Sequence, residues 1–513
     1  MSSSALRLPA LAAGRRVKRS LFVERRRWQW ATVAAVGVAV AMLPLYENDS
    51  MWLGPGVALM VLIGWHSLVV GRRLPWIPGL ALATAALQWV IAPWITYHIG
   101  PYFQSFRMVV LPEQYFAFAV PAFASLGVGM LGVLRRPGRT APPAAASVGP
   151  VTSRFRWTCD AMVVIGVATE LVLAPLLGGG SLSFVGLLVT NLAFVGALAL
   201  LLARAPGWQF RAAAVLGVQA LVSAASGMFH DLVLWTAYFG LTLVYVYRWR
   251  ARTIAVLVAS GMAAIMILNV VKREFRQTLE TQQTGLLGSA SVLGSAMIDN
   301  ADPELAYEGN GFKANVTRLN QGWIIARVLY WVPEREPYAR GETVSATVRA
   351  TLLPRILDPN KLQLGGQTYF ARFTGMPLLR TSMDLSVPGE MYANFGYWGS
   401  LFGVLVFGAL IGLVYRVFLR WGHRSQLWWA WAPYVLLYST RAENSVAEVT
   451  NHVVKSAIIM LAVISFVPAW AMLRRPLRAR LSRALRLPSR LGASDGQSLA
   501  AGEARRGGRF GAR

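Results

Sequence analysis

Two groups of residues in this chain have types and positions that could do chemistry. The first is Lys272, Arg273 and Arg276, which directly follow a long apolar run. Planar guanidinium groups bind phosphates through paired hydrogen bonds, so this group predicts a site for an anionic head group such as a diphosphate. The same pattern is typical of basic side chains that reach from a membrane helix to the interface, and this alternative stays open.

The second is Glu390, in the turn-rich segment SVPGEMYANFGYWG at 386–399, some six residues before another apolar run. A carboxylate at the start of a membrane helix is stabilised by the helix dipole by about 0.3–1 kcal/mol. Glu390 lies some way before the apolar run, so the dipole is only a partial explanation. We therefore keep Glu390 as a candidate functional residue.

Composition identifies the elements that must position these residues. Of the 513 residues, 55% are hydrophobic and 14% charged, whereas a soluble domain carries about 25% charged residues. The net charge of +27 does not predict nucleic-acid binding, because the basic residues form short clusters between apolar runs. We therefore expect an all-α polytopic membrane protein that contacts membrane lipids.

The apolar runs predict about twelve transmembrane helices, because each approaches the ~20 residues needed to cross the hydrocarbon core. The expected spans are 28–46, 52–70, 75–97, 114–134, 157–177, 184–203, 212–228, 231–247, 252–271, 396–417, 426–440 and 453–473.

The basic clusters all fall on one side of the membrane if these spans alternate, which predicts that both termini are cytoplasmic. The chain then divides into a basic N-terminus (1–27), nine helices (28–271), a large extracytoplasmic loop (272–395), three helices (396–473) and a basic tail (474–513) that we expect to be disordered. The loop holds 12 of the 23 acidic residues. Apolar spacing within it predicts amphipathic helices at 313–331 and 341–353, with turns at PNKLQLGGQ and FTGMP.

Three segments together carry a resemblance to a known family. They are GETV at 341–344, PRILDPNK at 354–361 and GEMYANFGYWG at 389–399. The arrangement resembles the O-antigen polymerase (Wzy-type oligosaccharide repeat-unit polymerase) family over about residues 330–420. The family often has Trp and Pro where this chain has Leu357 and Leu362.

The resemblance implies a GT-C-like membrane glycosyltransferase of the bacterial cytoplasmic membrane that joins polyprenyl-diphosphate-linked oligosaccharides at the outer face. A chain-length regulator is a further partner of such enzymes. The diphosphate leaving group needs cations, and the acceptor hydroxyl needs a base or an orienting group. The resemblance assigns catalysis to Glu390 and Asp384, and diphosphate and sugar binding to two further sets. These are Arg273, Arg276, Arg355, Lys361 and Arg441 for the diphosphate, and Tyr392, Asn394, Tyr397 and Trp398 for the sugar.

Three other functions remain open: an O-antigen ligase-like transferase, a transferase that uses lipid-phosphate sugars, and a transporter of lipid-linked oligosaccharides. The lipid-phosphate enzyme would require Glu47 and Asp49, in the first outer loop. A transporter would place charges near the membrane midplane, whereas here they concentrate in one loop. The sequence contains no phosphate-binding Gly-rich loop, no His/Cys cluster with metal spacing and no Gly-x-Ser-x-Gly motif, so we expect no cofactor and no metal.

Overall fold

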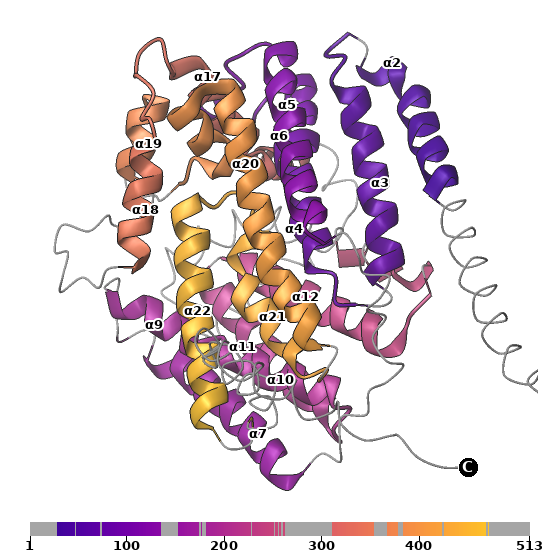
Figure 1. The fold of residues 1–513 in the computed structure, drawn as a ribbon, viewed down its shortest axis with the longest axis vertical. Helices are drawn as coiled ribbons and strands as arrows, with labels where there is room; N and C mark the ends of the chain where they lie inside the picture. The colour runs from indigo at the N-terminus through magenta and orange to yellow at the C-terminus, as the bar shows by residue number, and fades with distance from the viewer. Residues whose placement is uncertain are drawn as a thin grey trace, which may run out of the picture. The chain divides into compact units, whose positions relative to one another are not determined.

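The computed structural model describes residues 28–46, 48–71, 74–134, 152–173, 176, 181–226, 228–250, 252–254, 256–257, 260–261, 310–352, 367–377, 383–422, 425–467 and 470. Every regular element in these ranges is a helix, which confirms the expected all-α class (Figure 1). The chain divides into two compact units, residues 1–460 and 461–513. The first unit holds all the elements discussed below except the end of the last helix, α22 (Val446–Phe466). In the second unit, only residues 461–467 and 470 are described.

Six helices are long and apolar enough to cross a membrane, which indicates a membrane protein. They are Leu53–Gly71, Ile77–Ile99, Pro112–Gly132, Phe184–Leu202, Ser386–Gly422 and Val446–Phe466. The first corresponds to α3, the third to α6 (Pro112–Gly132), the fifth to α20 (Ser386–Gly422) and the sixth to α22 (Val446–Phe466). The second comprises α4 (Ile77–Ala86), a π-helical turn (Leu87–Ile91) and α5 (Ala92–Ile99). The fourth includes α10 (Leu192–Leu202), which follows α9 (Ser181–Thr190). These helices match six of the twelve expected spans.

The other expected spans are helical where they are described, but shorter or more polar. The first is a helix at Trp28–Ala41 followed by α2 (Leu43–Tyr46). The fifth is α7 (Ser153–Ala168) with a π-helical end, and the seventh and eighth are α11 (Trp208–Ser226) and α12 (His230–Tyr247). The eleventh is α21 (Trp428–Leu436), whose nine residues are all buried. Most of the ninth lies outside the described residues.

The most extensive contact between two helices joins α6 to α20, which run side by side (Figure 1). Glycines make this contact possible, because a Cβ at Gly408 would lie 2.6 Å from the Leu126 carbonyl oxygen and one at Gly412 would lie 2.5 Å from that of Met130. Gly129 on α6 likewise faces the backbone of Leu405. Small residues let two helix backbones approach closely where lipid supplies no hydrophobic drive for association.

The large loop contributes four described helices: α16 (Asn310–Leu319), α17 (Gly322–Trp331), α18 (Glu342–Leu352) and α19 (Gln367–Thr374). Figure 1 shows α17, α18 and α19 gathered around the beginning of α20. The helix expected at 341–353 is confirmed by α18. A shared apolar cluster that includes Trp323, Phe370 and Ala393 packs α17 and α19 against α20.

Two expectations about this region were wrong in detail, and one helix was not expected. The helix expected at 313–331 is two helices, because the Asn320 side chain accepts a hydrogen bond from the Trp323 N–H (3.2 Å) and so begins a second helix. Residues 367–374 form α19 between the two expected turns. The segment before the tenth span is helical from Ser386, and its turn is confined to Gly396, whose φ of +67° interrupts the helix.

Candidate functional site

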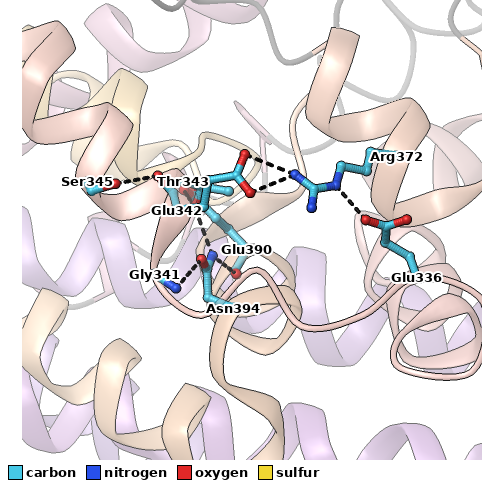
Figure 2. A network of polar contacts seen from close by, with 8 residues as sticks. All are labelled: Glu336, Gly341, Glu342, Thr343, Ser345, Arg372, Glu390 and Asn394. Atoms are coloured by element: carbon cyan, nitrogen blue, oxygen red, sulfur yellow. Dashed lines mark hydrogen bonds and ion pairs between the residues drawn. The ribbon is translucent and has the colours of Figure 1, made fainter.

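The site begins where the segment before α18 docks on the first turns of α20. The Ala339 N–H donates to the Ala393 carbonyl oxygen (2.9 Å), and the Arg340 N–H donates to that of Asn394 (3.0 Å). The Asn394 side chain closes the joint, since its Oδ1 accepts from the Gly341 N–H (3.0 Å) and its Nδ2 donates to Thr343 Oγ1 (2.7 Å), as Figure 2 shows. The GETV and GEMYANFGYWG motifs are therefore in direct contact.

Glu390 lies at the centre of this joint and is only 4% exposed. Its Oε1 accepts from Thr343 Oγ1 (2.7 Å; Figure 2), and its Oε2 accepts from the backbone N–H of Val446, the first residue of α22 (2.8 Å). A carboxylate is favourable at a helix N-terminus, where backbone N–H groups lack partners within the helix. Glu390 thus stabilises the start of α22, and it joins α18, α20 and α22 to one another.

An ion-pair network holds the outer part of the joint. Arg372 on α19 donates from Nε to Glu336 (2.5 Å) and from Nη1 to both oxygens of Glu342 (2.9 and 2.8 Å), as Figure 2 shows. These hydrogen bonds raise the pKa of Arg372. The group is partly exposed, so its contribution is that of a surface ion pair, about 0–1 kcal/mol each.

Asp384 lies at the same helix start as Glu390. Its Oδ2 accepts from the backbone N–H (3.3 Å) and the hydroxyl (3.1 Å) of Ser445, and the Ser445 hydroxyl in turn accepts from the Glu448 N–H. The carboxyl groups of Asp384 and Glu448 are neighbours, and each affects the pKa of the other. Burial is the main cause that raises the pKa of Asp384, although the Glu448 side chain and the Ser445 hydrogen bonds oppose it and the charge of Glu443 adds to it.

Arg441 lies in the segment between α21 and α22, which also contains Ser445. Its guanidinium forms an ion pair with Asp231 of α12 and covers the ring of Tyr438 at 4.4 Å from the ring centroid. Burial would lower the pKa of Arg441, but the negative charges around it, above all Asp231, raise it overall. The Nε atom of Arg441 is buried and has no hydrogen-bond partner. One of the fixed N–H donors of this cation is therefore not used within the protein.

Aromatic and imidazole groups extend this cluster into the helices. The Tyr438 ring stacks on His452 with ring centroids 4.2 Å apart, and the His452 Nε2 lies 3.0 Å from the Tyr434 carbonyl oxygen. His230 pairs with Glu443 (3.2 Å) beside Asp231. We call Asp231, Asp384, Arg441, Glu443 and Glu448 the Arg441 cluster. It combines a buried cation with several carboxyl groups, an arrangement that can hold an anion and transfer a proton.

The four predicted sugar-binding residues have different surroundings. Asn394 is buried and bonded within the joint, while Tyr392 and Tyr397 both pack edge-on against Phe118 of α6. The Tyr397 hydroxyl also donates to the Ala117 carbonyl oxygen (2.8 Å). Trp398 is 80% exposed, so it is the residue of this set with a large free surface.

The structure brings together Glu390, Asp384 and Arg441 from the predicted catalytic and diphosphate-binding residues. Arg273, Arg276, Arg355 and Lys361 lie outside the described residues. The sequence did not single out Asp231, which is separated from Arg441 by 210 positions. Its occurrence in a short turn between two apolar runs was the available signal.

In the described part of the chain, no three His, Cys, Asp or Glu side chains are arranged to hold a metal ion. The chain matches no protein-family model, and neither a characterised protein nor a solved structure gives a significant match.

Proposed function

We propose that this protein is a membrane glycosyltransferase that polymerises polyprenyl-diphosphate-linked oligosaccharide repeat units at the outer face of the bacterial cytoplasmic membrane. The proposal includes about twelve spans in a GT-C-like arrangement, cytoplasmic termini and the loop 272–395 on the outer side. Its support is the resemblance of three segments to the O-antigen polymerases, together with six helices that are apolar enough to cross a membrane.

One observation carries the proposal: the GETV and GEMYANFGYWG segments meet the Arg441 cluster at the start of α22. Val446 and Ser445 bind Glu390 and Asp384, and Arg441 lies only a few residues before them. Residues from α12, α18, α20 and α22, distant in sequence, thus place a cation and several carboxyl groups together.

The reaction that fits this chemistry is a displacement at the anomeric carbon of the donor sugar. The acceptor hydroxyl oxygen forms the new bond to that carbon, and the bond from the carbon to the diphosphate oxygen breaks. The diphosphate leaves with the electron pair. Arg441 would stabilise its charge through the Nε–H, and through any other guanidinium N–H groups that release their present partners. The hydroxyl proton would pass to the carboxylate of Asp384, which has the carboxyl group of Glu448 as a neighbour.

Glu390 takes a different part in this proposal. Both of its oxygens accept hydrogen bonds from the protein and its side chain is almost fully buried. We assign it the role of a positioning residue, which fixes α22 and therefore Arg441 and Asp384. Asp384, which is less deeply buried, is the better candidate for the base.

The test is the lipid-linked glycan pool of a strain that lacks this gene, complemented with wild type, Arg441→Gln, Asp384→Asn or the control Glu334→Gln. Glu334 is an exposed loop acid that forms none of the ion pairs described here. We expect single repeat units on polyprenyl diphosphate to accumulate, and long glycan to disappear, in the deletion strain and in both cluster variants. The control should restore long glycan.

Two other outcomes would contradict the proposal. Long lipid-linked polymer that never reaches its final acceptor would identify a ligase-like transferase. An unchanged lipid-linked pool in the deletion strain would exclude polymerisation and favour a transporter or an unrelated transferase.

A further inference from the structure

Two cationic side chains, Arg107 and Arg327, lie where the α5–α6 loop meets α17. The loop residues 105–108 are fastened to α17 by three contacts. The Phe106 ring stacks on Trp323 with centroids 4.6 Å apart, Asn320 Nδ2 lies 3.5 Å from the Met108 sulfur, and Arg327 Nη2 donates to the Ser105 carbonyl oxygen (3.4 Å). These contacts hold Arg107, within the same four residues, beside Arg327.

Arg107 and Arg327 lie near each other, and no carboxylate neutralises either of them among the described residues. The Arg327 Nε atom is buried and has no hydrogen-bond partner, while Arg107 is exposed. Burial, and then the charge of Arg107, lower the pKa of Arg327. Two like charges and an unused donor at one place are unfavourable unless an anion joins them.

The surroundings of the pair identify the kind of molecule that carries the anion. The loop follows α5 and precedes α6, so it lies at the ends of two helices that are long enough to cross a membrane. Three apolar residues in or next to the loop are exposed: Ile99 is 36%, Phe103 47% and Leu111 66% exposed. Apolar and aromatic side chains next to arginines at a helix end are typical of the membrane interface, where lipid phosphates lie.

We propose that Arg107 and Arg327 bind one phosphate group carried by a membrane lipid. The planar guanidinium of Arg327 offers its unpartnered Nε–H, and the exposed Arg107 nearby offers a second fork of donors, which matches the several acceptor oxygens of a phosphate. The lipid is a glycerophospholipid or a polyprenyl carrier, because both present a phosphate at this depth. The proposal does not rest on the proposed function, since neither arginine is bonded to a residue of the Arg441 cluster.

The experiment is native mass spectrometry of the purified full-length protein, titrated separately with phosphatidylglycerol and with polyprenyl diphosphate. Wild type is compared with Arg107→Gln, Arg327→Gln and the control Arg335→Gln. Arg335 is an exposed arginine near the end of α17 that packs on the rings of Tyr330 and Trp331. Its replacement by Gln removes one positive charge, as in the two test variants. We expect each test variant to bind at least one of the two lipids about tenfold more weakly, the loss expected for one charge-assisted hydrogen bond. The control should change binding by less than about twofold.

Loss of phosphatidylglycerol binding alone assigns the site to bulk lipid, and loss of polyprenyl diphosphate binding alone assigns it to the carrier. Unchanged binding of both lipids in Arg107→Gln overturns the proposal, and so does an equal loss in Arg335→Gln. Arg107 is exposed, so its replacement keeps the test valid if Arg327→Gln fails to fold. Long-glycan synthesis is measured in parallel, and it separates a failure of this proposal from a failure of the proposed function.

Discussion

Replacement of Glu390 distinguishes a positioning residue from a proton carrier. Glu390→Ala removes an acceptor that two donors share, Thr343 Oγ1 and the Val446 N–H, at a place that is 4% exposed. Each buried donor that loses its partner costs about 1–3 kcal/mol, so the variant should lose about 2–6 kcal/mol of unfolding free energy. Glu390→Gln keeps one acceptor oxygen for Val446, and its amide can donate to Thr343. It should therefore lose only about 1.5–3 kcal/mol, the value of one hydrogen bond to a charged group.

The assay is unfolding of the purified protein in detergent, followed beside production of long lipid-linked glycan in the complemented deletion strain. A positioning residue predicts that glycan yield follows stability, so that the Gln variant retains most of the product and the Ala variant loses it. Glu334→Ala, an exposed carboxylate of the same loop, is the control and should change stability by less than about 0.5 kcal/mol. A fully stable Gln variant that makes no polymer would refute this reasoning, because it would show that Glu390 itself moves a proton. Wild-type stability of the Ala variant would refute the hydrogen-bonded role.

Three further changes test other parts of the structure. Arg441→Gln and Asp231→Asn should each destabilise the protein, and a double-mutant cycle should show about 1–3 kcal/mol of coupling; a coupling near zero would contradict the ion pair. Burial raises the folded-state pKa of Asp384 above its ordinary value of 3.8. The stability linked to this carboxyl group is therefore fully present below about pH 4, and it is lost as the pH rises and the buried group must ionise. The melting temperature of Asp384→Asn relative to wild type should therefore increase from about pH 4 towards neutral pH, and a constant difference would count against the burial of this group. Gly408→Ala should cost at least about 1–3 kcal/mol through its contact with the α6 backbone, whereas Gly217→Ala, with nothing within 4 Å, should not destabilise; thermal unfolding measures both, and equal effects would contradict the close approach of α6 and α20.

Local composition was enough to predict the class of this fold. Long apolar runs can satisfy their backbone groups in lipid only as helices, so the all-α class followed, and six of the expected spans agree with helices of sufficient length. The amphipathic spacing at 341–353 likewise predicted α18. The helix break after Leu319 was not visible in that spacing, because it depends on the Asn320 side chain. A helix was predicted at 426–440, but α21 is only nine residues long, so the apolar run did not predict where the helix begins and ends.

The sequence by itself determined which residues are candidates, because charged residues make up only 14% of the chain and Glu390, Asp384 and Arg441 lie close to predicted membrane helices. Only the tertiary structure decided how they are used. Glu390 was predicted to be a catalytic residue, with the dipole of the helix that follows it as the alternative explanation, and the structure shows that it accepts a hydrogen bond from the start of α22, 56 positions later. Asp231 pairs with Arg441 across 210 positions. Such pairings depend on how helices pack, which residue type and spacing do not specify, and they determine which partners each carboxylate has within the protein.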